Sequence, residues 1–179
     1  ESTYYAGWKE KRGRKDNHRG IGLGCSGFVC GARLGGHAAS GSFIQVNGDG
    51  GVTLMTGSSD IGQGSKTVLA QIIAEELGLS PSDVTVLSAD TETTPIDPGT
   101  FSSRVTFYAG NATLIAVREV KAQLLQIAAY LMEANINDIV FQDKKVFIKG
   151  NPDSYISFGE LAKKAESLGP GRLIIGKGY

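Results

Sequence analysis

The sequence predicts an α+β fold with two layers, in which helices pack on a mixed β-sheet. Two segments have the composition and turn residues of β-hairpins, and two others carry apolar side chains at helical spacing. Hairpins join antiparallel strands, whereas a strand–helix–strand connection allows parallel ones. The alternation of the two connection types therefore favours a mixed sheet.

The first hairpin should occupy the stretch "SGSFIQVNGDGGVTLMTG". Phe43 and Gln45 alternate with Ile44 and Val46, as expected for a strand with two different faces. The following "NGDGG" supplies turn residues, and "VTLMT" returns as the second strand.

A helix is expected from Ser65 to Leu77, because its apolar residues form a helical stripe and Gly78 supplies a stop. The next stretch, "DVTVLSAD", should be a strand with Val84 and Val86 on one side. Residues 91–103 contain two prolines and should form an irregular polar loop.

The second half should begin with a long helix from about Arg104 to Glu133. A second hairpin, "DIVFQDKKVFI", should turn near Asp143 and Lys144. A last helix should open at Ser157 with a capping box and close at Gly169. Near the start, "YYAGWKEKR" should end a helix, and the glycine-rich "GIGLGCSGFVCG" should be a strand.

Composition excludes some classes of function. The 18 Lys and Arg residues balance 18 Asp and Glu residues, which argues against a general nucleic-acid or polybasic membrane binder. The basic residues between Lys9 and Arg19 are interpreted as a solvated face or linker, and His18 and His37 as surface residues. No apolar run has the length of a bilayer span, so we expect no membrane span.

The cysteine pair "CSGFVC" has the first spacing of a plant-type iron–sulfur motif. Arg33 stands where the third cysteine would be, so Cys25 and Cys30 are interpreted as reduced, small hydrophobic side chains. This interpretation goes with a cytoplasmic location.

The stretch "GSSDIGQGSKT" lies between a strand and a helix, where a glycine-rich turn makes a favourable anion site. It is not a P-loop: Gln63 follows Gly62 where a lysine is required, and Asp60 would repel a phosphate. A second loop, "DPGTFSSRVTF", also leads into a helix. Two helix starts rich in hydrogen-bond donors suggest one extended, anionic ligand between them.

These loops resemble the large subunit of the molybdenum hydroxylases, the family of xanthine dehydrogenase and aldehyde oxidoreductase. The matching patterns are "DIGQG.KT...QI.AEELG" and "V.....DT..TP.D.GT.SSR.T...GNA...A". The run "SADTETTPIDPGTFSSRVTFYAGNA" is particularly similar to the 4-hydroxybenzoyl-CoA reductase branch. The resemblance covers essentially the whole chain and implies part of a molybdopterin-binding domain.

The resemblance implies a cofactor, molybdopterin with molybdenum, as its cytosine dinucleotide. Gln63 would donate a hydrogen bond near the molybdenum, and the backbone of the second loop would hold the pterin and pyrophosphate. Arg104 would either bind phosphate or brace its loop. The residues that the resemblance places at the cofactor are Gly62, Gln63, Gly64, Thr100, Phe101, Ser102, Ser103 and Arg104.

The resemblance also implies an oxidoreductase whose iron–sulfur clusters and FAD lie on partner subunits or domains. Its substrate would be a small aromatic molecule or a CoA thioester. We expect the chain to be a fragment, inactive alone, with a leading helix and linker at 1–20, a cofactor-loop core at 21–134, and a hairpin, a helix and the start of a strand at 135–179.

No catalytic base is assigned, because the family's "GxGE" motif does not occur here, and no protein metal ligand is expected. Asp60, Asp90 and Asp97 are interpreted as cap or turn residues. Two alternatives stay open: a nucleotide-phosphate-binding enzyme that uses residues 57–67, and a non-catalytic structural or assembly module.

Overall fold

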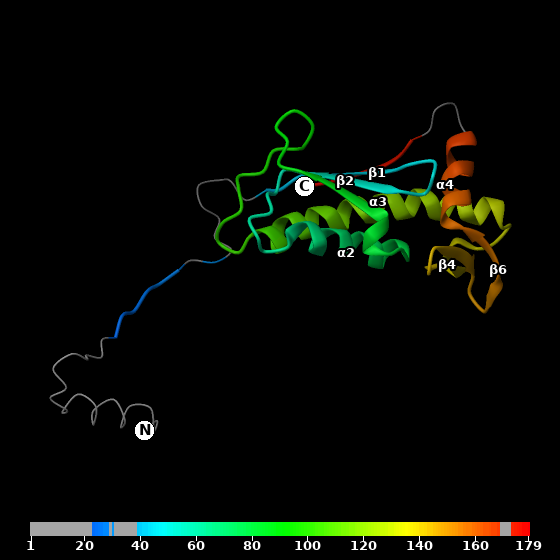
Figure 1. Ribbon diagram of the computed structural model, residues 1–179. Helices are drawn as coiled ribbons and strands as arrows, with labels where there is room; N and C mark the ends of the chain where they lie inside the picture. The colour runs from blue at the N-terminus through cyan, green and yellow to red at the C-terminus, as the bar shows by residue number, and fades with distance from the viewer. Residues whose placement is uncertain (1–22, 29, 31–38, 169–172) are drawn as a thin grey trace, which may run out of the picture.

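The computed structural model describes residues 23–28, 30, 39–168 and 173–179. In this part of the chain, a four-stranded sheet forms one layer, and helices α2 and α3 form the layer beneath it (Figure 1). Helix α4 and a small three-stranded sheet lie at one end of these layers. The prediction of an α+β fold with helices on a mixed sheet is confirmed.

The main sheet has the strand order β3-β2-β1-β7. Strand β1 is antiparallel to β2 and to β7, whereas β2 and β3 are parallel, so the sheet is mixed as expected. In the predicted hairpin, Ile44 lies opposite Leu54, and both side chains are fully buried. The strands are β1 (Ser42–Val46), β2 (Val52–Thr56), β3 (Val84–Ser88) and β7 (Ile174–Gly178).

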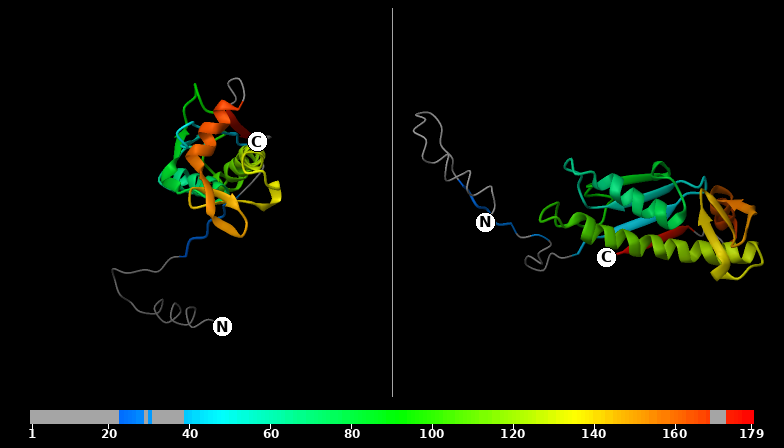
Figure 2. Two further views of the ribbon diagram at one scale, coloured as in Figure 1. Left: turned by 90° about the vertical axis from the view of Figure 1, so that its right-hand side faces the viewer. Right: turned by 90° about the horizontal axis from the view of Figure 1, so that it is seen from below.

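Helices α2 (Ser65–Leu77) and α3 (Val105–Leu131) lie side by side and run in the same direction (Figure 2). Helix α2 has the predicted bounds, and Gly78 ends it with a left-handed φ of 63°. Glu76 of α2 forms ion pairs with Arg118 and Lys121 of α3, at 3.3 and 3.1 Å. Because the helices are parallel, both begin at the same end of the molecule.

The core lies between the main sheet and the two long helices. Buried and half-buried residues alternate along β1 and β2, and the buried face packs on the apolar stripe of α3. Val117, Val120 and Leu124 of this stripe are fully buried, which matches the periodicity of the sequence. No helix in the described part of the chain is long and apolar enough to cross a bilayer.

Strand β7 lies very close to α3. A methyl group added at Gly178 would clash with the backbone carbonyl of Ala112, and one at Gly176 would clash with the carbonyl of Ala116. Both glycines therefore let a strand approach a helix backbone more closely than any residue with a Cβ atom allows.

The second hairpin is confirmed: β4 (Ile139–Gln142) and β5 (Lys145–Ile148) join through Asp143 and Lys144, whose φ angles are 50° and 61°. The sequence did not predict the third strand of this sheet, β6 (Asn151–Ser157). A short 3-10 helix at Pro81–Asp83 directly precedes β3, and another at Ile136–Asp138 directly precedes β4.

Helix α4 (Phe158–Ser167) begins with the predicted capping box. The Ser157 hydroxyl accepts from the Glu160 N–H at 3.2 Å, and the Glu160 carboxylate accepts from the Ser157 N–H at 3.1 Å. The predicted end at Gly169 lies outside the described residues.

The strand expected over "GIGLGCSGFVCG" is wrong for its described part. Residues 23–28 and 30 have no regular secondary structure and are exposed, and no neighbouring atom would meet a Cβ added at Gly24 or Gly27. Cys25 and Cys30 are free thiols, as expected, but they are exposed and not packed as hydrophobic side chains. The N-terminal helix, the basic cluster, His18 and His37 lie outside the described residues.

Candidate functional site

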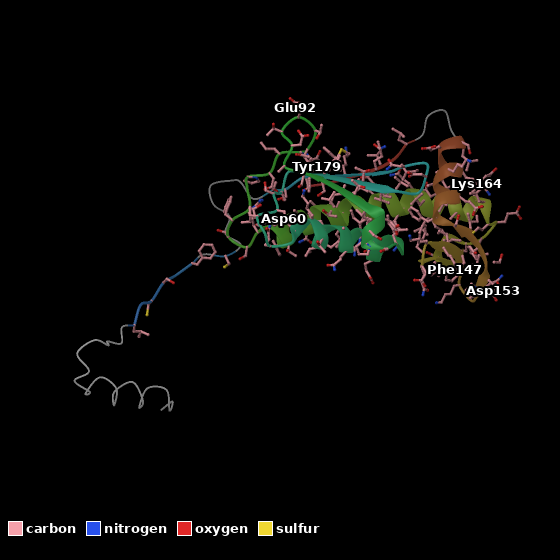
Figure 3. All side chains as sticks on the ribbon, viewed as in Figure 1. Asp60, Glu92, Phe147, Asp153, Lys164 and Tyr179 are labelled. Atoms are coloured by element: carbon pink, nitrogen blue, oxygen red, sulfur yellow. The ribbon has the colours of Figure 1, made fainter. Side chains whose placement is uncertain are left out.

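The glycine loop (residues 57–64) and the serine loop (residues 95–104) lie against each other at the end where α2 and α3 begin. The Thr100 hydroxyl donates to the Ser59 carbonyl at 2.8 Å, and a Cβ at Gly57 would clash with the Pro95 carbonyl. The prediction that the two loops form one site is thus consistent with their positions. In Figure 3, Asp60 marks this end, and Phe147 and Asp153 mark the opposite one.

The glycine loop carries Gln63 between two residues with left-handed backbone. The φ angles of Gly62 and Gly64 are 102° and 78°, which few residues with side chains adopt. No described atom lies within 4 Å of a Cβ position at either glycine, so this side of the loop is open. The exposed Gln63 side chain folds back: its Oε1 accepts from Ile61 N at 2.7 Å, and its Nε2 donates to Ser59 O at 3.2 Å.

Asp60 holds the glycine loop against the start of α2. Its carboxylate accepts from Gly62 N at 2.9 Å and from Lys66 N at 3.3 Å. The N–H of Gly62 and then that of Lys66 hold the pKa of Asp60 below its usual value, because they stabilise the charged carboxylate. The interpretation of Asp60 as a cap or turn residue is confirmed.

We expect the Asp60 contacts to be lost only in acid. A carboxyl group with a lowered pKa in the folded state stabilises that state at neutral pH, and the contribution disappears as pH falls through the folded-state pKa. In NMR spectra of protein with ¹⁵N-labelled glycine, the Gly62 amide should titrate below the usual pKa of an aspartate. Asp60→Asn should abolish this titration and Asp90→Asn should preserve it; a Gly62 signal that titrates unchanged in Asp60→Asn would contradict the assignment.

The serine loop contains a tight, strained turn. Ser102 and Ser103 both have a φ of 51°, and Arg104 N donates to Phe101 O at 3.1 Å. Left-handed backbone costs roughly 1–2 kcal/mol for each residue with a side chain, so two such residues in a row require support from their surroundings.

That support includes a buried ion pair. Arg104 Nη1 lies 2.8 Å from Asp97 Oδ1, and the two side chains are 3% and 0% exposed. Arg104 also donates to the carbonyls of Gly99 and Ala39, at 3.0 and 3.1 Å. The Arg104 contacts therefore match the bracing role that was one of the two expected from the resemblance.

Asp97 was interpreted as a cap or turn residue, and this describes only one of its contacts. It accepts from Gly99 N at 2.8 Å, as in an Asx turn. Its other oxygen accepts from the hydroxyls of Ser40 and Ser58, at 2.6 and 2.7 Å. The buried carboxylate of Asp97 thus accepts hydrogen bonds from several segments, a role that the sequence did not reveal. Asp90, by contrast, is the expected turn residue, because it accepts from Glu92 N at 2.9 Å.

Helices α2 and α3 begin differently from the other helical segments. Their N-cap residues, Gly64 and Arg104, make no side-chain capping bond. The other described helical segments have such a bond, from Ser80, Asn135 or Ser157. The N–H groups at the start of α3 in particular lack a capping side chain, and such groups favour an anion.

A hollow of about 450 Å³ adjoins the two loops. It is lined by Gly57, Ser59, Ala89, Asp90, Thr91, Thr94, Pro95, Ile96 and Asp97. Among the described residues, no three His, Cys, Asp or Glu side chains are grouped so that they could hold a metal ion. The hollow offers the hydroxyls of Ser59, Thr91 and Thr94, and none of the eight residues that the resemblance places at the cofactor lines it.

Residues 1–176 match the sequence model of the molybdopterin cofactor-binding domain. The chain belongs to this family. Its relatives include the gamma subunit of the 6-hydroxypseudooxynicotine dehydrogenase complex of Paenarthrobacter nicotinovorans, which is 37% identical over 90% of this chain. The large chain of carbon monoxide dehydrogenase from Afipia carboxidovorans is 34% identical over 85% of it. The xanthine dehydrogenase molybdenum-binding subunit of Escherichia coli O157:H7 is 30% identical over 88%.

Solved structures of the family show the same fold. Quinoline 2-oxidoreductase from Pseudomonas putida 86 superposes with a TM-score of 0.72 and 27% identity, over 84% of this chain and 21% of its own. The Cu,Mo-containing carbon monoxide dehydrogenase superposes with a TM-score of 0.67 and 33% identity, over 78% and 18%. This molybdopterin cofactor-binding chain spans only about a fifth of the length of the three sequence relatives named above.

Proposed function

We propose that this chain holds molybdopterin through its glycine and serine loops, as part of the large subunit of a molybdenum hydroxylase. The observation that carries the proposal is the meeting of these two loops at the starts of α2 and α3, in a chain of the molybdopterin-binding family. The residues that would contact the cofactor are Gly62, Gln63, Gly64, Thr100, Phe101, Ser102 and Ser103, and the buried Arg104 would brace the serine loop from beneath.

The charges at the two helix starts favour one orientation of the cofactor. The carboxylate of Asp60 already occupies the start of α2, so a phosphate there would be repelled. At α3 the charge of Asp97 is neutralised by Arg104, and no side chain caps the helix. We therefore place the pyrophosphate at the serine loop and the molybdenum end of the cofactor at Gly62–Gly64, where Gln63 would donate toward it.

In this role Arg104 would support the serine loop from its buried side, through its ion pair with Asp97. Ser102 and Ser103 would offer their backbone N–H groups to the cofactor. When bound, the cofactor supplies two-electron oxidation–reduction at its molybdenum. The chain itself orients the pterin and fills the space around it. The carboxylate at α2 also counts against the alternative of a nucleotide-phosphate enzyme that uses residues 57–67.

The proposal extends to the whole protein. It would be a molybdopterin-dependent oxidoreductase of the cytoplasm, with the cofactor as its cytosine dinucleotide, and with an iron–sulfur subunit and an FAD subunit as partners. This chain alone would be inactive. Similarity of the run "SADTETTPIDPGTFSSRVTFYAGNA" supports membership of the 4-hydroxybenzoyl-CoA reductase branch, and thus an aromatic or CoA-thioester substrate.

The first test is the composition of the full-length protein purified with its natural partners. Elemental analysis should find close to one molybdenum per large subunit, and acid should release CMP in the same amount. A preparation with its full complement of iron and flavin but without molybdenum would overturn the proposal. Molybdenum without CMP would refute only the dinucleotide form.

A further inference from the structure

We propose that Asp97 is a positioning residue that holds both cofactor loops in their binding shape through separate bonds to each. The inference rests on the proposed function, because it assigns those loops to the cofactor. It concerns the Asp97 cluster, which we define as Asp97 with its four donors. The donors are the hydroxyls of Ser40 and Ser58, the N–H of Gly99 and the guanidinium of Arg104.

The four donors come from three segments of the chain: the residues before β1, the glycine loop and the serine loop. Ser40 precedes β1, Ser58 belongs to the glycine loop, Gly99 belongs to the serine loop, and Arg104 is the N-cap of α3. An ionised carboxylate has about four acceptor sites, and here each oxygen accepts from two donors. No other single side chain in the described residues receives bonds from both loops.

The cluster lies below the surface that would face the cofactor. The Asp97 side chain is fully buried, Arg104 is 2% exposed, and Ser58 is 1% exposed. These side chains therefore act through the backbone that they hold: Ser58 precedes the open glycine turn, and Arg104 follows the strained Ser102–Ser103 turn. A buried charge whose partner is removed is strongly unfavourable, so loss of the Asp97 charge should release the Arg104 side of the cluster.

Two variants distinguish the ion pair between Asp97 and Arg104 from the hydrogen bond between Ser58 and Asp97. Asp97→Asn keeps the shape but removes the charge opposite Arg104, so it should loosen both loops. Ser58→Ala removes one hydroxyl and leaves the ion pair intact, so it should loosen only the glycine loop. Asp153→Asn is the control, because Asp153 is an exposed aspartate of β6 at the opposite end of the molecule from the two loops.

The experiment is hydrogen exchange by mass spectrometry on the full-length complex, together with its rate of molybdenum loss at 25 °C. In Asp97→Asn, exchange in peptides covering 57–64 and 99–104 should rise by about tenfold, with the middle of α3 unchanged, and molybdenum should dissociate at least about tenfold faster. In Ser58→Ala only the 57–64 peptide should change. Asp153→Asn should behave as the wild type in both measurements.

The inference is overturned if Asp97→Asn leaves the 57–64 peptide unchanged, or if exchange rises equally through α3 and the main sheet, which would indicate a merely structural role. It is also overturned if Ser58→Ala loosens neither loop. Absence of molybdenum from the wild-type complex would instead defeat the proposed function. The exchange measurement still decides whether Asp97 holds both loops in that case.

Discussion

Replacing Gln63 by alanine should lower the turnover of the full-length complex by about tenfold to a thousandfold. Gln63 is exposed on the open part of the glycine loop, between two glycines with left-handed backbone, and its side chain would have to turn from its own loop toward the cofactor. A hydrogen-bond donor that acts on charge in the transition state is worth about 10²–10³ in rate when it is removed. The two bonds that Gln63 makes within its own loop are exposed, so the fold should not depend on it.

The measurement is turnover with molybdenum content determined on the same sample. Gln71→Ala is the control, because Gln71 is an exposed glutamine on the same helix that begins at the glycine loop. Normal turnover by Gln63→Ala at full molybdenum content would remove Gln63 from the site. It would favour the alternative that this region is a structural or assembly module.

Replacing Gly178 by alanine should destabilise the fold on the order of 3 kcal/mol. The added methyl group would clash with the carbonyl of Ala112, which belongs to the middle of a helix and cannot move away alone. Strand β7 would have to withdraw from α3, and the buried Ile174 and its contacts with the core would be disturbed.

Urea unfolding followed by circular dichroism measures this effect as a lower midpoint. Gly27→Ala is the control, since nothing lies near a Cβ at that position and we expect no change beyond a few tenths of a kcal/mol. An unchanged midpoint for Gly178→Ala would mean that β7 does not contact α3 as described.

The elements with a regular pattern were predictable. The stripe of α2, the turn residues of both hairpins and the capping box of α4 each act locally, and each is present where the sequence indicated. Strand β6 was missed because "NPDSYIS" contains a proline and polar residues that are typical of a loop. The strand predicted at "GIGLGCSGFVCG" was wrong for the opposite reason. Its apolar residues are typical of a strand, but among so many glycines they form none in the described part.

The candidate site was predictable as two loops but not as a connected cluster. Glycines and hydroxyl residues before a helix identify each loop separately. The bonds from Ser40 and Ser58 to Asp97 join positions 57 and 39 residues apart, and no local pattern records such pairs. One signal did exist: an arginine at the start of a helix is unfavourable against the helix dipole, so Arg104 required an acidic partner nearby.

The position of β7 has a consequence for how this chain is synthesised. Strand β1 pairs on one side with β2, a few residues away, and on the other with β7, which lies at the far end of the chain. At about 5–20 residues per second, a ribosome needs on the order of ten seconds to make the intervening segment. During that time the nascent chain carries β1 with one unpaired edge, to which another strand could add. Chaperone binding to ribosome-bound chains should therefore be strongest before β7 emerges and weaken once it has paired.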